Sequence, residues 1–138
     1  MEDCIFCKII KGEIPADKVY EDDRVLAFLD ISPINKGHIL VVPKEHFENL
    51  LETPDELVEK LVLAGKKIGL AVREVVRAEG INVGINNGSA AGQVVFHTHI
   101  HIIPRFSDDG YKLWGSDKKY ELGEGRELAQ KIQEQLNN

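Results

Sequence analysis

The 138-residue sequence predicts an α+β domain made of a β-sheet, one long helix and a C-terminal helix. Short runs of β-branched residues end at proline or at turn residues, which is typical of strands. One apolar pattern of helical period begins near Thr53, and a second closes the chain. No repeat or linker divides the sequence. We therefore expect residues 1–138 to form a single domain, with a core over about 4–105 and a tail over 106–138.

The composition argues against several classes of protein. The formal net charge is −6 and no basic run is present, which disfavours a general nucleic-acid or membrane-surface binder. A phosphorylated ligand remains compatible, because backbone N–H groups bind phosphate without a basic surface. The acidic N-terminus is followed by no apolar run of signal-peptide or bilayer-spanning length. We expect a cytoplasmic protein with neither nucleic acid nor membrane as a partner.

Two cysteines, Cys4 and Cys7, lie in a predicted short helix or turn over residues 4–11, which Gly12 closes. In a cytosolic chain such a pair indicates metal binding more than a disulfide. Three interpretations stay open: half of a zinc site, a redox pair, or two unrelated thiols. A redox pair normally follows the first strand of a βαβ unit, and none precedes it here. A zinc site would need two more ligands, for which the histidines are the only soft candidates.

Three strands are predicted next, over residues 18–21, 24–30 and 38–43. An acidic turn joins the first two, and a loop with Ser-Pro and Lys-Gly separates the second from the third. His38 stands at the start of the third strand, and His46 lies just beyond its end.

The long helix should run from Thr53 to about Arg77. Thr53 can cap it, Pro54 suits the first helical position, and Glu56 stands at the spacing of a capping box.

Apolar residues of this helix form two adjacent stripes, a wider face than packing on one sheet requires. The first stripe is Leu57, Leu61, Ala64, Ile68, Val72 and Val75, and the second is Val58, Val62, Gly65, Gly69 and Val76. Each mid-helix glycine costs about 1 kcal/mol relative to alanine. We interpret Gly65 and Gly69 as a place where another backbone comes close. The domain's own sheet is one candidate, and the excess apolar width favours the other, a partner helix in a homodimer.

A fourth strand is predicted over 81–86, where apolar and polar residues alternate. Residues 87–93 form a small-residue loop whose backbone N–H groups can approach an anion closely. An ordinary hairpin connection is the alternative, and the loop's place just before a histidine row favours the anion. After Arg105, a polar stretch leads to a C-terminal helix over about 126–136.

The histidine row occupies residues 96–104, Phe-His-Thr-His-Ile-His-Ile-Ile-Pro, which reads as a strand ended by Pro104. His97, His99 and His101 would then share one face, with about 6.6 Å between successive rings. A chance cluster is less probable than chemistry for three of the chain's five histidines. The row would hold a catalytic metal, or one histidine would be a nucleophile.

The nucleophile interpretation requires an imidazole with one free nitrogen and one pinned proton. A phosphoryl centre also needs donors for its oxygens, which His101, Gln93 and the N–H groups around Gly92 and Val94 could supply. The metal interpretation is mildly disfavoured, because no acidic residue lies in the row or just before it.

The segment His-Thr-His-Ile-His-Ile-Ile at 97–103 resembles the histidine-triad pattern His-φ-His-φ-His-φ-φ, in which φ is apolar. Residues 25–33 and 37–46 are similar to that family as well, as are Asn86-Asn87-Gly88 and Ala91-Gly92-Gln93. The resemblance covers residues 4 to about 105. It is strongest to the Hint-like, zinc-bearing bacterial and archaeal branch of nucleotide hydrolases and transferases.

This resemblance implies a homodimer whose halves share one continuous antiparallel sheet. It also implies hydrolysis at the α-phosphate of purine nucleoside phosphoramidates or acyl-adenylates, with no organic cofactor. His99 would be the nucleophile and carry a transient nucleotidyl group. His101 and Gln93 would contact the phosphate, and His38 would support them by hydrogen bonding. A dinucleoside polyphosphate hydrolase, a nucleotide-binding interaction protein with incidental hydrolysis and a metal-dependent hydrolase remain the alternatives.

Two further sets of residues follow from the resemblance. Asp30 would hold the ribose hydroxyls, and Asn86 would face the ribose–phosphate side. The base pocket would be lined by Phe6, Ile9, Phe28 and Ile31. The family's structural zinc would be bound by Cys4, Cys7, His46 and His97. The sequence departs from eukaryotic members at Val94, where they carry a serine, and in the tail after Arg105, so substrate choice is left open.

Overall fold

The computed structural model describes residues 3–138 and confirms an α+β fold. The strands form one antiparallel sheet in the order β1-β2-β3-β5-β4, with β1 and β4 at its edges. The strands are β1 (Lys18–Glu21), β2 (Val25–Leu29), β3 (Ile39–Pro43), β4 (Gly80–Gly84) and β5 (Ile100–Arg105). The helices are α1 (Ile5–Ile10), α2 (Asp55–Val76) and α3 (Glu124–Leu136), with short 3-10 turns at Leu50–Glu52 and Ser89–Ala91. Among the described residues, no helix is long and apolar enough to cross a membrane.

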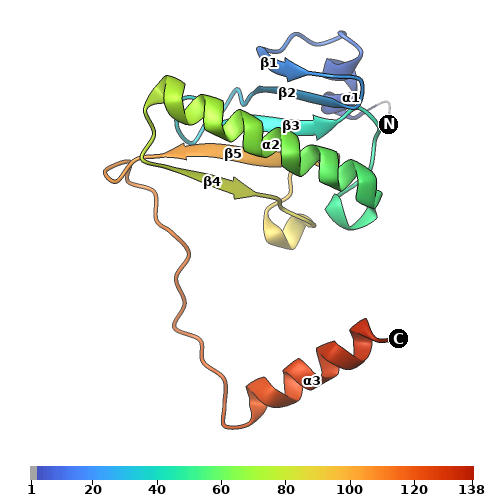
Figure 1. The fold of residues 1–138 in the computed structure, drawn as a ribbon, viewed down its shortest axis with the longest axis vertical. Helices are drawn as coiled ribbons and strands as arrows, with labels where there is room; N and C mark the ends of the chain where they lie inside the picture. Colours follow the sequence, from blue (N-terminus) through green and yellow to red (C-terminus); the bar gives the residue numbers. More distant parts are fainter. Residues whose placement is uncertain (1–2) are drawn as a thin grey trace.

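The long helix α2 covers one face of the sheet (Figure 1). Side chains alternate between faces along a strand, so every second residue of β2, β3 and β5 points at this helix. The resulting core consists of Val25, Ala27, Ile39, Val41, Ile100 and Ile102 from the sheet with Leu61, Ala64, Ile68 and Val72 from α2. This core fixes β5, which carries His101, in the interior of the sheet.

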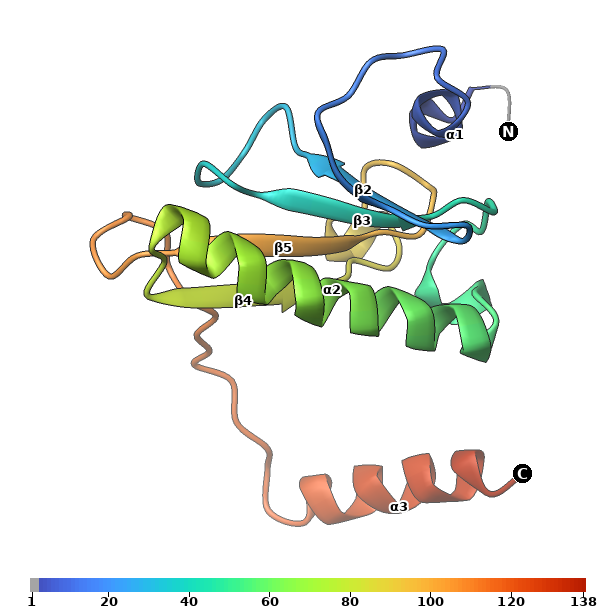
Figure 2. The same cartoon turned by 45° about the horizontal axis from the view of Figure 1, so that its top comes forward.

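The opposite face of the sheet carries α1 (Figure 2). A second apolar cluster fills the space between them, made of Phe6, Ile9, Leu26, Phe28, Leu40 and Val42. The CxxC segment is thereby held on the side of the sheet away from α2.

The C-terminal helix α3 lies apart from the sheet and from α2, at the end of an extended connection (Figures 1 and 2). Its apolar side chains, including Leu128, Ile132 and Leu136, are exposed to solvent. The helix begins at Glu124, two residues before the predicted start.

The predicted cap of α2 is wrong. Pro54 takes the N-cap position, and no side chain caps the helix. The hydroxyl of Thr53 is instead 2.8 Å from the Asn49 carbonyl and 2.8 Å from the hydroxyl of Thr98, so it cannot serve the helix N-terminus. Thr53 therefore ties the start of α2 to the histidine segment.

The glycines of α2 face the domain's own sheet, which corrects our interpretation of them as a contact with a partner helix. A Cβ built on Gly65 would lie 3.5 Å from Ile102, and one on Gly69 would lie 3.8 Å from Ile81. Both glycines are buried together with the first apolar stripe, but Val75 of that stripe is exposed.

The prediction of a single strand over 96–104 is wrong for its first half. Strand β5 begins only at Ile100, so His97 and His99 precede it and His101 alone lies within it. The backbone N–H of Thr98 donates to the Phe47 carbonyl, outside the sheet, which draws this segment away from β3.

Pro104 also lies inside β5 instead of ending it. On the side of β5 that faces β3, the pairing begins only at Ile102, so no residue of β3 lies beside Pro104. The backbone N–H that proline lacks would therefore have no strand partner on that side. The Pro104 carbonyl on that side accepts a hydrogen bond from the Asn35 side chain at 2.8 Å.

Candidate active site and metal centre

A Cys2His2 cluster lies between α1 and the segment before β5. It consists of Cys4, Cys7, His46 and His97, whose ligand atoms all lie within 4.8 Å of one another. The CxxC turn places both sulfurs on one side of α1, and the connections after β3 and before β5 bring in the two imidazoles. All four residues proposed from the resemblance as zinc ligands thus come together.

Distances within the Cys2His2 cluster are close to those in a tetrahedral zinc site, with the two imidazole nitrogens slightly nearer to each other than ideal. The Cys4 sulfur lies 3.3 Å from His97 Nδ1, the Cys7 sulfur lies 3.4 Å from His46 Nδ1, and the two Nδ1 atoms are 3.1 Å apart. Zinc bonds of about 2.0–2.1 Å to nitrogen and 2.3 Å to sulfur separate ligands by about 3.3–3.8 Å.

The protonation of His97 suits a metal ligand. Its Nε2 lies 2.8 Å from the Pro43 carbonyl, which accepts only from an N–H, so Nδ1 carries the lone pair that points at the sulfurs. Burial lowers the pKa of His97 to about 4 and keeps the ring neutral. Burial also raises the pKa of the Cys7 thiol, so a thiolate there needs a cation beside it. This donor set fits zinc, with the Pro43 carbonyl orienting one ligand.

In the His99 ring the proton and the lone pair are on the opposite nitrogens from those in His97. Its Nδ1 lies 2.7 Å from the His97 carbonyl and so carries the proton, which leaves a lone pair on Nε2. The ring packs edge-on against Phe6, with 5.1 Å between centroids. Burial lowers the pKa of His99 below its usual value, so the neutral, nucleophilic form predominates at neutral pH.

His38 and His101 form a hydrogen-bonded pair beside His99. The backbone N–H of Ile34 donates to His38 Nδ1 at 3.1 Å, so the His38 proton is on Nε2. That nitrogen lies 2.9 Å from His101 Nδ1 and donates to it. His101 must then carry its own proton on Nε2, and its ring centroid lies 4.9 Å from that of His99. We call His38, His99 and His101 the histidine trio: it offers one lone pair and, next to it, one N–H donor.

Asp30 lies beside the trio, and the three side chains Asp30, His38 and His101 are close enough to suggest a second metal site. The tautomers argue against it, because the nitrogen of His38 that faces the group carries a proton and cannot ligate a cation. The carboxylate of Asp30 lies 3.7 Å from that nitrogen and accepts the Ser32 N–H at 2.9 Å. Asp30 retains acceptor capacity for a ligand hydroxyl.

Gln93 is buried, and its amide is occupied within the protein. Its oxygen accepts from the Gly88 N–H at 2.8 Å, and its nitrogen donates to the carbonyls of Glu48 and Val95. A phosphate contact through this amide would require one of these bonds to break. The geometry favours bracing of the loop before the histidines, and the phosphate contact stays a prediction.

The residues expected around the base are divided by the structure. Phe6, Ile9 and Phe28 are buried in the cluster between α1 and the sheet, whereas Ile31 is 93% exposed. Among the residues expected near the phosphate, Gly92 has a positive φ of 93° and lies beside the Asn86 side chain. Val94 is 84% exposed, so it provides no buried group where the eukaryotic serine stands.

Sequence reasoning missed a cavity of about 600 Å³ next to the trio. Its floor is formed by β4 and β5, and one wall comes from the chain after β5. The lining residues are Ile34, His38, Asn82, Val83, Gly84, Asn86, His101, Ile103, Arg105, Lys112, Leu113 and Trp114. The aromatic Trp114 in a largely polar stretch was the available signal, but its distance from His101 in space could not be predicted from the sequence.

Comparison with known proteins identifies relatives that match most of this chain. A model of the HIT domain matches residues 11–108. The HIT protein of Bacillus subtilis is 56% identical over 111 residues, covering 80% of this chain and 77% of the relative. Adenylylsulfatase HINT3 of Arabidopsis thaliana is 44% identical over 132 residues, covering 94% of this chain and 66% of the relative.

Solved structures agree with these sequence matches. A Streptococcus mutans protein superposes with a TM-score of 0.93 at 44% identity, covering 99% of this chain and 87% of the other. A histidine triad nucleotide-binding protein from Candida albicans gives 0.85 at 36% identity, covering 98% of each chain. A zinc-bound histidine triad family protein from Mycobacterium smegmatis gives 0.77 at 40% identity, covering 96% of this chain and 97% of the other.

Proposed function

The chain belongs to the HIT domain family, and we propose that it hydrolyses purine nucleoside phosphoramidates or acyl-adenylates at the α-phosphate through a covalent nucleotidyl-His99. The observation that carries this proposal is the tautomer of His99. Its Nδ1–H is bonded to the His97 carbonyl at 2.7 Å, so the free lone pair on Nε2 lies next to His101. A nucleophile and a hydrogen-bond donor on adjacent rings suit attack on a phosphoryl group.

The reaction would proceed in two steps. Nε2 of His99 bonds to the α-phosphorus as the phosphorus–nitrogen bond of the substrate breaks, and the amine leaves with a proton taken from water. Water then attacks phosphorus in the nucleotidyl-His99, and its hydroxyl bonds to phosphorus as the Nε2–phosphorus bond breaks. The proton that this water releases neutralises the hydroxide left by the first step. During both steps the His101 N–H would donate to a non-bridging oxygen, and His38 would hold His101 in the required tautomer.

We propose that the Cys2His2 cluster binds a structural zinc that joins α1 to the sheet. Support comes from the inward lone pair of His97, the near-tetrahedral distances and the zinc-bound relative of Mycobacterium smegmatis. All four positions would be occupied by protein ligands, which is typical of a structural site and leaves none for substrate.

A cytoplasmic homodimer is the proposed form of the protein. Strand β4 lies at an edge of the sheet and is largely exposed, which permits continuation of the sheet into a second copy. The exposed apolar side chains of α3 also suit contact with another copy, since a helix of 13 residues is marginal in water on its own.

Replacing the nucleophile tests the reaction directly. We expect His99→Asn to lower turnover of adenosine 5′-phosphoramidate by about 10³-fold or more while AMP still binds, as measured by calorimetry. Rapid quench of the wild type followed by peptide mass spectrometry should locate an adenylyl group on His99. Full activity of His99→Asn would disprove the mechanism.

The substrate class is tested by parallel kinetics. Adenosine 5′-phosphoramidate, adenylyl sulfate and diadenosine polyphosphates would be compared on the same preparation. Adenylyl sulfate is included because a relative is named for its cleavage. A higher kcat/KM for a diadenosine compound would favour a polyphosphate hydrolase, and turnover too slow to detect on all three would favour a binding protein.

A further inference from the structure

The loop between β2 and β3 supplies the hydrogen bond on which the tautomers of the histidine trio depend. The backbone N–H of Ile34 donates to His38 Nδ1 at 3.1 Å, so the His38 proton is on Nε2. That Nε2–H donates to His101 Nδ1 at 2.9 Å, which leaves the proton of His101 on its own Nε2. The N–H that is proposed to donate to a phosphoryl oxygen therefore exists only while the Ile34 N–H stays in place.

Without the Ile34 N–H, the pair of rings has a second arrangement. His38 can then carry its proton on Nδ1 and accept, through Nε2, a hydrogen bond from His101 Nδ1. This change reverses the hydrogen bond between the two rings and leaves a lone pair, in place of an N–H, on His101 Nε2. A lone pair repels the oxygens of a phosphoryl group, so only the first arrangement suits the proposed reaction.

Apolar packing does not hold the part of this loop that carries the Ile34 N–H, because residues 31–34 are all exposed to solvent. The other end of the loop is fixed at Gly37, which has a positive φ of 97°. A Cβ at this position would lie 3.0 Å from Val72 of α2, so the backbone packs closely there. That contact fixes the backbone of His38, but the Ile34 N–H needs an anchor of its own.

Asn35 supplies that anchor through its side-chain amide. Its Nδ2 donates to the Pro104 carbonyl at 2.8 Å and to the Asp109 carboxylate at 3.0 Å. Both partners are acceptors only, so the amide has a single orientation and both of its hydrogens are used. The backbone carbonyl of Asn35 also accepts the His38 N–H at 3.1 Å, which closes the turn. One residue thus fastens the loop to the end of β5.

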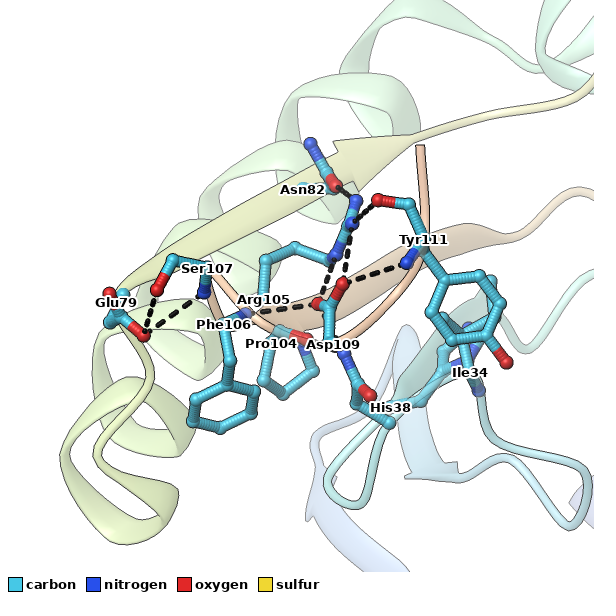
Figure 3. Close-up of polar contacts among 11 residues, drawn as sticks. Ile34, His38, Glu79, Asn82, Pro104, Arg105, Phe106, Ser107, Asp109 and Tyr111 are labelled. Atoms are coloured by element: carbon cyan, nitrogen blue, oxygen red, sulfur yellow. Dashed lines mark hydrogen bonds and ion pairs between the residues drawn. The ribbon is translucent and has the colours of Figure 1, made fainter. Parts of the chain in front are cut away.

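The carboxylate that receives the Asn35 amide is itself held in place (Figure 3). Asp109 accepts two bonds from Arg105, at 2.8 Å from Nε and 3.0 Å from Nη2. It also accepts the backbone N–H groups of Phe106 and Tyr111, both at 3.0 Å. The hydrogen bond from Arg105 holds the pKa of Asp109 far below its usual range, so the carboxylate keeps its charge at neutral pH. A charged acceptor makes the bond from Asn35 stronger than one between neutral groups.

We propose that Asn35 is a positioning residue of the active site, which fixes the tautomers of His38 and His101 by holding the loop between β2 and β3. The inference rests on the proposed function, since His101 needs an N–H on Nε2 only if it binds a phosphoryl oxygen. Among the described residues, the Asn35 side chain donates only to Pro104 and Asp109, so its effect passes through the backbone of the loop.

Steady-state kinetics on adenosine 5′-phosphoramidate test the proposal. We expect Asn35→Ala to lower kcat about tenfold with KM little changed, because kcat scales with the fraction of molecules in the required tautomers. Asp22→Ala is the control, since it also removes a side chain that braces a loop. Asp22 accepts the N–H groups of Arg24 and Val25, both at 2.8 Å, in the turn at the far end of β2. This control should lower the melting temperature and keep the wild-type kcat.

A double-mutant cycle separates positioning of His38 from a general loosening of the fold. In the His38→Phe background, Asn35→Ala should have no further effect on kcat, because the ring through which it acts is absent. The same fall in kcat in both backgrounds would overturn the inference and leave the proposed function standing. An unchanged kcat in Asn35→Ala alone would overturn it as well.

Nuclear magnetic resonance provides a readout that does not depend on turnover. Long-range proton–nitrogen correlation spectra of the full-length protein distinguish a protonated ring nitrogen from one with a lone pair, and His38→Phe assigns the His38 signals. The wild type and Asp22→Ala should show the N–H of His38 and His101 on Nε2, and Asn35→Ala should show a second set of signals with the His38 proton on Nδ1. Unchanged tautomers in Asn35→Ala would overturn the inference. If the wild type does not hydrolyse the phosphoramidate, the proposed function is wrong, and these spectra still decide whether Asn35 fixes the tautomers.

Discussion

Two histidines that are two residues apart face two different groups of side chains, and the difference lies in which ring nitrogen is hydrogen-bonded to a backbone carbonyl. The Pro43 carbonyl binds Nε2 of His97, so the free Nδ1 faces the cysteines. The His97 carbonyl binds Nδ1 of His99, so the free Nε2 faces the trio. Both rings are buried and neutral. Under the proposed function, identical side chains would thus gain a metal-binding or a nucleophilic role from one backbone hydrogen bond each.

The comparison predicts that stability and activity can be separated by substitution. Cys7→Ser removes one thiolate from the Cys2His2 cluster, and we expect a loss in the free energy of unfolding on the order of 5 kcal/mol. Thermal unfolding and zinc content by mass spectrometry would measure it. His99→Asn is the control and should keep both the melting temperature and the zinc. Equal stability of Cys7→Ser, with and without a chelator, would show that the cluster holds no structural metal.

The second prediction concerns the hydrogen bond between His38 and His101. His38→Phe removes the donor to His101 Nδ1, so the His101 tautomer is no longer fixed. We expect kcat to fall about 10²-fold, as for other losses of alignment, with KM little changed. Zinc content should stay at the wild-type level, since His38 contacts none of the cluster. Retention of full kcat would show that His101 needs no orienting partner.

Much of this arrangement was predictable from the sequence, and the reasons for the misses are specific. The helical period of apolar residues around Ile68 predicted the long helix, because a helix that is buried on one face repeats apolar residues at that period. The boundaries at Pro43 and Arg77 were predicted from their residue types. The alternation at 97–101 suggested one strand with a shared face. It failed because the Thr98 N–H bonds to Phe47 outside the sheet, a tertiary contact that alternation does not encode.

Residues of the site show the same limit. Grouping the Cys2His2 ligands depended on resemblance, since CxxC and two distant histidines carry no spacing that joins them. The hydrogen bonds around Arg105 and Asp109 could not be predicted, because Asn35, which donates to Asp109, and Asn82, which accepts from Arg105, lie far from them in the sequence. The role of Gly69 was misjudged for a related reason: a glycine marks a close approach without saying what approaches, and here it is the side chains of Ile81 and Ile102, not another backbone.

The third prediction uses pH to test burial of the trio. Burial lowers the pKa of His101 to about 4, while the unfolded chain has a value near 6.5. Between these values the unfolded state binds more protons, so stability is complete above about pH 6.5 and is lost as pH falls toward 4. We expect the burial of His101 to lower the free energy of unfolding by about 2 kcal/mol over this pH range, after allowance for solvent screening. Urea unfolding at several pH values should show a shallower decline for His101→Gln than for the wild type. Parallel declines would indicate that the ring is solvated.

The smallest effect is expected at Thr98, which lies between the two histidines and belongs to neither group. Its hydroxyl is 2.8 Å from that of Thr53 and 3.2 Å from the Phe47 carbonyl. Thr98→Val keeps the shape and removes these bonds, and Thr53 still donates to the Asn49 carbonyl. We therefore expect a loss of about 1 kcal/mol in unfolding free energy. Because the segment carries both rings, zinc affinity and kcat should fall together and by similar small factors. A change in only one of them would mean that each ring is held by its own group, independently of the backbone between them.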